Sequence, residues 1–151
     1  MKISLFPFDC PTCATSFQAA VLSDFSYGLL LYRTRGGEVQ YVDAFGDPVF
    51  ADISTRVNRA LMGHSLEPNQ LADAVQRVFG VCCDRSEGGR TFSSATLPRC
   101  AECEAVGHQS SDDPVGVLDV NHVTHVAWQA VEEREKQRWV DGELSGTVSS
   151  V

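Results

Sequence analysis

The stretch Cys10-Pro11-Thr12-Cys13 near the start of the chain has a counterpart in Cys100-Ala101-Glu102-Cys103, two-thirds of the way along. Each Cys-x-x-Cys turn places two sulfur atoms on one tight bend, and each follows a segment that we expect to be extended. Two such turns that face each other supply four thiolates in the tetrahedral arrangement that zinc prefers. We therefore predict one structural Zn²⁺ ion, with Cys10, Cys13, Cys100 and Cys103 as its ligands.

Other uses of these four cysteines stay open at this point. A rubredoxin-like iron site takes the same four thiolates. Redox-active dithiols are less favoured, because a thioredoxin-like motif opens a helix in a βαβ setting that this sequence lacks. Structural disulfides need an oxidising compartment, whereas residues 1–10 lack the pattern of an export signal, so a cytoplasmic location is the default. The adjacent Cys82 and Cys83 follow an apolar helix stripe, and we expect them to pack in the core.

The two Cys-x-x-Cys knuckles resemble the zinc-ribbon class, chiefly through Cys-Pro-x-Cys in the first one. The resemblance covers the knuckles and their flanking strands, and it implies a small β-rich zinc-binding core with the same four ligands. Two features depart from the class. Ala14 and Glu104 stand where many such knuckles have glycine, and 86 residues separate the knuckles, against a usual spacing of about 15–20.

The long spacer is predicted to contain a β-hairpin and two helices. Gly36-Gly37 lies between two β-rich runs, residues 28–35 and 38–45, which is a hairpin signal. Asp47-Pro48 is a strong helix start, because Asp can cap free N–H groups and Pro has no N–H to leave unpaired. That helix is expected to close at Gly63, and a second one to run from about residues 65–68 to Gly80.

The remaining segments complete a predicted α+β fold. Residues 91–96 read as a strand that leads into the second knuckle, and residues 104–121 as a loop, because Gly, Ser, Asp and Pro break any periodicity. A final helix is predicted over about residues 124–144. The expected architecture is thus a zinc-ribbon-like β core, with two helices inserted between the knuckles and a C-terminal helix.

The length of 151 residues suits one domain with its own core. We expect a single zinc-stabilised domain over residues 1–144 and a disordered tail over residues 145–151. No apolar run approaches the roughly 20 residues that a membrane helix needs, so no membrane association is predicted.

The net charge of −8 is unevenly spread along the chain. Residues 1–99 carry ten acidic and nine basic side chains, whereas residues 100–151 carry ten acidic and three basic ones. Such a surface repels phosphates, so nucleic-acid binding is disfavoured, although it is the usual expectation for a zinc ribbon. Arg33 and Arg35, which point the same way on one predicted strand, could still contribute to a local basic patch.

No catalytic motif is present, and two weaker site hypotheses remain. Asp119, His122 and His125 are spaced by three, so an early start of the final helix would place them on one face as a second metal site. Trp128 and Trp139 share a predicted helix face and form a candidate surface for an unknown protein partner. The leading interpretation is a non-catalytic zinc-binding domain for protein interaction or regulation; the alternatives are a nucleic-acid-binding zinc ribbon and a metal-dependent enzyme.

Overall fold

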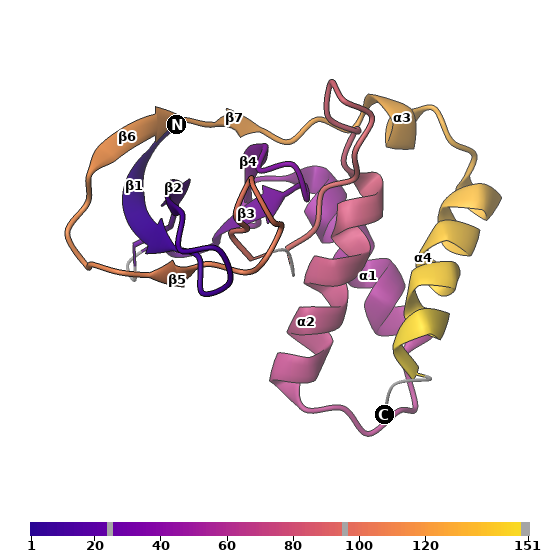
Figure 1. Ribbon diagram of the computed structural model, residues 1–151. Helices are drawn as coiled ribbons and strands as arrows, with labels where there is room; N and C mark the ends of the chain where they lie inside the picture. Colours follow the sequence, from indigo (N-terminus) through magenta and orange to yellow (C-terminus); the bar gives the residue numbers. More distant parts are fainter. Residues whose placement is uncertain (24–25, 95–96, 149–151) are drawn as a thin grey trace.

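The computed structural model describes residues 1–23, 26–94 and 97–148, except for the side chains of residues 147 and 148. Its elements form three layers, which Figure 1 shows from left to right. A four-stranded sheet that carries the cysteine knuckles lies at one end, a three-stranded sheet lies in the middle, and the helices cover the far side. We call the two sheets the knuckle sheet and the middle sheet. The presence of both helices and sheets confirms the predicted α+β class.

The knuckle sheet is organised around its first strand, β1 (Lys2–Asp9). β2 (Ser16–Ala20) pairs antiparallel with one edge of β1, and β5 (His108–Gln109) and β6 (Gly116–Asp119) pair antiparallel with the other. The predicted loop over residues 104–121 was therefore wrong. These strands pair through their main chain while most of their side chains stay exposed, so they leave no alternating apolar pattern in the sequence.

The middle sheet contains the predicted hairpin. β3 (Leu29–Arg33) and β4 (Val39–Asp43) are antiparallel, and β7 (Asn121–His122) joins β4 in parallel. Between the first two strands are five residues, 34–38, and not only the Gly-Gly pair. The segment predicted as a strand over residues 91–96 contributes a single β-bridge, between Ser93 and Arg33, and residues 95 and 96 lie outside the described part of the chain.

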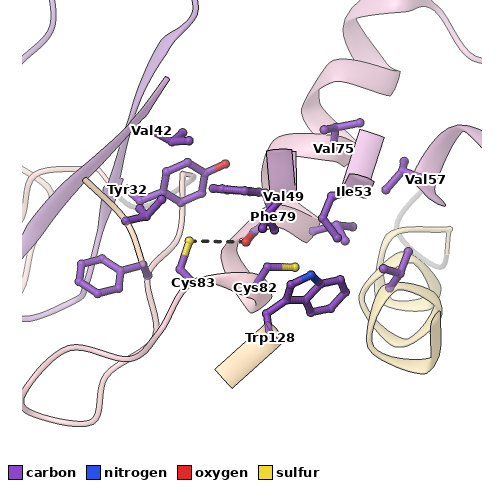
Figure 2. Close-up of a cluster of buried hydrophobic side chains, with 14 of the residues drawn as sticks. Tyr32, Val42, Val49, Ile53, Val57, Val75, Phe79, Cys82, Cys83 and Trp128 are labelled. Carbon is purple, nitrogen blue, oxygen red and sulfur yellow. Dashed lines mark hydrogen bonds between the residues drawn. The ribbon is translucent and has the colours of Figure 1, made fainter. Parts of the chain in front are cut away.

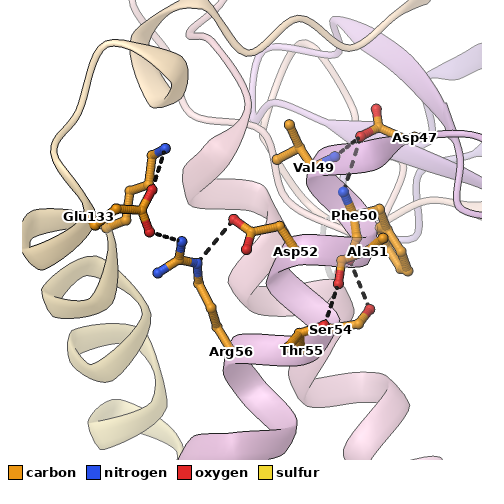
Figure 3. Close-up of polar contacts among 10 residues, drawn as sticks. Asp47, Val49, Phe50, Ala51, Asp52, Ser54, Thr55, Arg56 and Glu133 are labelled. Atoms are coloured by element: carbon orange, nitrogen blue, oxygen red, sulfur yellow. Dashed lines mark hydrogen bonds and ion pairs between the residues drawn. The ribbon is translucent and has the colours of Figure 1, made fainter.

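The two predicted central helices are confirmed. Helix α1 (Pro48–Ala60) begins where Asp47 Oδ1 accepts hydrogen bonds from the backbone N–H groups of Val49 and Phe50, as Figure 3 shows. Helix α2 (Pro68–Phe79) starts with a capping box of Glu67 and Gln70, and continues into the short 3₁₀ helix η1 (Gly80–Cys82).

The predicted C-terminal helix is two helices, α3 (Val126–Gln129) and α4 (Glu133–Val148). Asp84 fixes the start of α3, because its carboxylate accepts hydrogen bonds from the N–H groups of Val126 and Ala127. Arg56 on α1 binds both Asp52 and Glu133, and so joins α1 to the start of α4 (Figure 3). The first residues of the predicted tail, 145–148, are helical; residues 149–151 lie outside the described part.

Two apolar clusters separate the three layers. Ile3, Ala20 and Val120 pack between the two sheets. The larger cluster lies between the middle sheet and the helices, and Val140 and Leu144 of α4 are buried in it, so α4 belongs to the folded core. Figure 2 shows this cluster; its labelled members are Tyr32, Val42, Val49, Ile53, Val57, Val75, Phe79, Cys82, Cys83 and Trp128.

Cys82 and Cys83 lie inside the larger cluster, as predicted, with 1% and 8% of their surface exposed. Burial and the nearby carboxylate of Asp47 raise the pKa of Cys83 to about 12, and burial also raises the pKa of Cys82. Both side chains therefore behave as small apolar groups.

Among the described residues, no helix is long and apolar enough to cross a membrane.

Candidate metal centre

The two cysteine knuckles have the same backbone geometry, although 86 residues separate them. In the first, the N–H of Ala14 donates to the carbonyl of Cys10 at 3.0 Å, and the N–H of Cys10 donates to the carbonyl of Thr15 at 2.9 Å. In the second, Glu104, Cys100 and Ala105 make the two equivalent bonds, both at 2.9 Å. The first cysteine of each knuckle is buried and the second is exposed, so the knuckles form two equivalent halves of one site.

The structure brings all four predicted cysteines together. Cys10 Sγ lies 3.3 Å from Cys103 Sγ, and Cys13 Sγ lies 3.6 Å from Cys100 Sγ. All four sulfur atoms lie within 4.8 Å of one another. A tetrahedron of sulfurs with zinc–sulfur bonds of about 2.3 Å has edges of about 3.8 Å. The four thiols therefore fit a metal ion. A search of the described residues for three or more neighbouring metal-ligating side chains gives this group alone.

Hydrogen bonds from the knuckle backbones favour thiolates. The N–H groups of Cys13 and Thr12 point at Cys10 Sγ and lower its pKa. The side chain and the backbone N–H of Thr15 lower the pKa of Cys13 to about 6. At Cys103 the N–H of Ala105 acts in the same direction, but the surrounding sulfurs and burial outweigh it and raise that pKa to about 12. Four thiols this close cannot all ionise without a cation among them, which is the charge that a metal supplies.

The residue after each knuckle adopts a left-handed backbone conformation. Ala14 has a φ of 60° and Glu104 a φ of 61°, and these are the positive-φ residues other than glycine in the described chain. The knuckle turn requires this conformation, which explains why many zinc ribbons have glycine there. The departure from the class noted in the sequence therefore changes the side chain and not the shape of the turn.

The second knuckle is positioned by contacts with the strands of the first. Phe8 and Asp9 of β1 pair with Gln109 and His108 of β5. Gly107 lies directly against the Phe17 ring, where an added Cβ would come within 2.3 Å of the ring, so a side chain has no room there. The metal centre thus lies at a junction where strand pairing and close packing also hold the two knuckles together.

The second predicted metal site is not assembled. Asp119 ends β6, His122 lies in β7, and His125 precedes α3, so the three residues do not share a helix face. The prediction failed because the final helix begins after His125 and not before it.

His125 instead has a structural role. Its Nδ1 lies 2.8 Å from the carbonyl oxygen of Cys82, and its Nε2 lies 3.0 Å from Asp47 Oδ2. His125 and Asp47 are both buried. The pair therefore connects the start of α1 to η1 and to the start of α3.

The predicted shared helix face was wrong, because Trp128 lies on α3 and Trp139 on α4, but the two rings contact each other with centroids 5.9 Å apart. Trp128 is only 2% exposed and belongs to the core, so its side chain is not available to a partner at the surface. Trp139 is half-buried, donates its indole N–H to Glu135, and lines a surface cavity of about 590 Å³. Glu135 thus accepts the hydrogen bond of the half-buried indole.

Comparisons with known proteins give no relative: no family model matches the chain, and neither does any curated protein or solved structure. The likeness to zinc ribbons therefore rests on the four-cysteine site and the two knuckles themselves.

Proposed function

We propose that this chain is a non-catalytic domain, stabilised by zinc at Cys10, Cys13, Cys100 and Cys103, that acts in protein–protein interaction or regulation. The observation that supports this proposal best is the saturated ligand set. Catalytic zinc sites keep a position open for water or substrate, whereas four thiolates fill a tetrahedral shell. The ion then contributes to folding and takes no part in a reaction.

The place of the site in the chain indicates what the ion stabilises. It connects residue 10 to residue 100, and so joins the first strand to the segment that delivers β5 and β6 to the same sheet. A metal that binds the folded chain and not the unfolded one shifts the equilibrium toward the fold. The helical layer, in contrast, has its own apolar core.

Replacement of zinc by Co²⁺ tests the closed site. The cobalt protein should show the absorption of a four-sulfur tetrahedral ion, and added imidazole should leave the spectrum unchanged because no ligand position is open. A spectrum that changes saturably with imidazole would show an open position and contradict a purely structural role. If the protein as purified shows the colour of an iron–tetrathiolate site, the bound ion is iron and not zinc.

The acidic C-terminal third is the proposed partner surface, and it would bind a partner with a basic surface. Residues 100–151 carry seven more acidic than basic side chains, and Glu132, Asp141 and Glu143 are exposed on or beside α4. Removal of residues 123–151 is unsuited to a test, because that segment contributes Trp128, Val140 and Leu144 to the core.

A photo-crosslinking residue offers a sharper test of this surface. Gly142 of α4 faces open space, and Ala72 on the exposed side of α2 serves as the matched position. We expect a discrete crosslinked protein from position 142 and none from position 72. The product from position 142 should disappear when Glu132, Asp141 and Glu143 are changed to glutamine. Equal crosslinking from both positions, or none from either, would contradict the proposal.

A further inference from the structure

A small cavity of about 100 Å³ lies between the knuckle sheet and the turn of the β3–β4 hairpin. Residues 17–20 of β2 and residues 97–99 before the second knuckle line it from one side, and residues 33–35 and Gly37 line it from the other. Three arginines are among its lining residues, namely Arg33, Arg35 and Arg99. None of the described residues that line it is acidic, in a chain with 20 acidic and 12 basic side chains.

Arg33 is the innermost of the three and lacks a counter-charge. It is half-buried, and its guanidinium donates a hydrogen bond to the backbone carbonyl of Ala20 across the gap between the sheets. Among the described residues, no carboxylate oxygen lies within the 4.0 Å of an ion pair. Burial lowers the pKa of this guanidinium. Buried charges in proteins are normally paired, so an anion in the cavity would supply what the chain does not.

The other two arginines are exposed and line the same cavity. Arg33 is the last residue of β3 and Arg35 lies in the turn that follows, and both line the cavity. Arg35 has no ion-pair partner within the described residues, and Arg99 donates to the backbone carbonyl of Glu104. Arg56, on α1, is paired with carboxylates, and Arg90, which packs against Gly36 of the hairpin turn, lies 3.9 Å from the carboxylate of Glu38.

We propose that this cavity, defined by Arg33, Arg35 and Arg99, binds a phosphate group, either as the free ion or as a small phosphate monoester. Guanidinium groups bind phosphate and carboxylate oxygens through paired N–H donors. Three cationic side chains around one small cavity suit the double negative charge of a phosphate better than the single charge of a carboxylate. The small volume suits one such group.

The test is a titration of the zinc-loaded, full-length protein with inorganic phosphate at constant ionic strength, followed by the NMR signals of the arginine Nε–H groups. We expect saturable shifts for Arg33 and Arg35 and no shift for Arg59, an exposed arginine on α1 outside the cavity. Glycerol phosphate, titrated in the same way, separates the two sources: binding of both indicates a monoester site, and binding of phosphate alone indicates the free ion.

Two variants of equal charge make the test specific. Arg35→Gln should weaken phosphate binding by about tenfold, because an interaction between two charged groups is lost, whereas Arg59→Gln should leave it unchanged. Arg35 has no structural partner in the described chain, so this variant is expected to fold even if Arg33→Gln does not. The proposal is overturned if no saturable shift occurs, if the two variants behave alike, or if acetate binds as tightly as phosphate.

Discussion

Replacing Ala14 and Glu104 with glycine should stabilise the zinc-loaded protein, although neither change adds a contact. Both residues have a φ near +60°, which places their Cβ atoms close to the following carbonyl oxygen and costs about 1–2 kcal/mol per residue. Glycine removes that cost, but its greater conformational freedom in the unfolded chain lowers the free energy of unfolding by about 0.4–1 kcal/mol. The net gain is about 0.5–1 kcal/mol at each position.

The double variant should therefore gain about 1.5 kcal/mol, which for a domain of this size raises the melting temperature by about 3–6 °C. Thermal and urea unfolding with zinc in constant excess measure the change. Ala101→Gly is the matched control: it lies inside the second knuckle, and its φ is not positive. We expect that variant to lose about 0.5–1 kcal/mol. If Ala14→Gly and Glu104→Gly are destabilised as much as this control, the two residues do not have the left-handed conformation described above.

Four further predictions concern the core and the metal. Asp47→Ala should cost about 2–4 kcal/mol in urea unfolding, because it removes a helix cap and the partner of buried His125. Asp73→Ala, at an exposed position of α2, should cost less than about 0.5 kcal/mol, and equal losses would refute the role of Asp47. Tyr32→Phe should cost about 1 kcal/mol, because the hydroxyl donates to the carbonyl of Gln76 at 2.7 Å, and an unchanged urea midpoint would contradict that bond. The pKa of Cys83 is raised from 9.0 to about 12, so its contribution is complete below pH 9 and is lost as the pH rises toward 12. At pH 10.5 the free energy of unfolding should have fallen by about 2 kcal/mol more in the wild type than in Cys83→Ala, and parallel pH profiles would exclude this effect. Chelation of the metal should increase hydrogen exchange in residues 98–119 while α1 and α2 stay protected; uniform exchange throughout would show that the metal stabilises the helical layer as well.

The features that the sequence predicted well are those with a strong local cause. The spacing of the two Cys-x-x-Cys turns indicated the four-cysteine site, and Asp47-Pro48 marked the start of α1. Gly36-Gly37 indicated the hairpin, because β-rich runs lie on both sides of it. Within each knuckle, at the helix start and at the turn, the residues that make the structure are neighbours in the chain, although the two knuckles themselves are far apart.

The features that were missed depend on partners far away in the chain. β6 pairs with β1 through its backbone, and its Val117 is 60% exposed, so no apolar alternation marks the strand. The break between α3 and α4 has no proline or glycine to announce it. The cap on α3 comes from Asp84, about forty residues earlier, which no local reading of the final segment would use.

The arginine cavity could be predicted only in part. The sequence indicated that Arg33 and Arg35 could share a local basic patch, but it placed both on one strand, whereas β3 ends at Arg33 and Arg35 lies in the turn. β2 reaches this place because it pairs with β1, and Arg99 reaches it because the second knuckle folds back onto β1. The long spacing between the knuckles thus brings together a cavity that no single segment encodes.

The central claim is that four cysteine sulfurs, two from each end of an 86-residue spacer, bind one metal ion. X-ray absorption at the zinc edge, on protein that contains one equivalent of zinc, tests it most directly. We expect four sulfur neighbours at about 2.3 Å and no nitrogen or oxygen bound to the metal. A shell with fewer than four sulfurs, or a zinc signal unchanged in Cys10→Ser and Cys100→Ser variants, would contradict it.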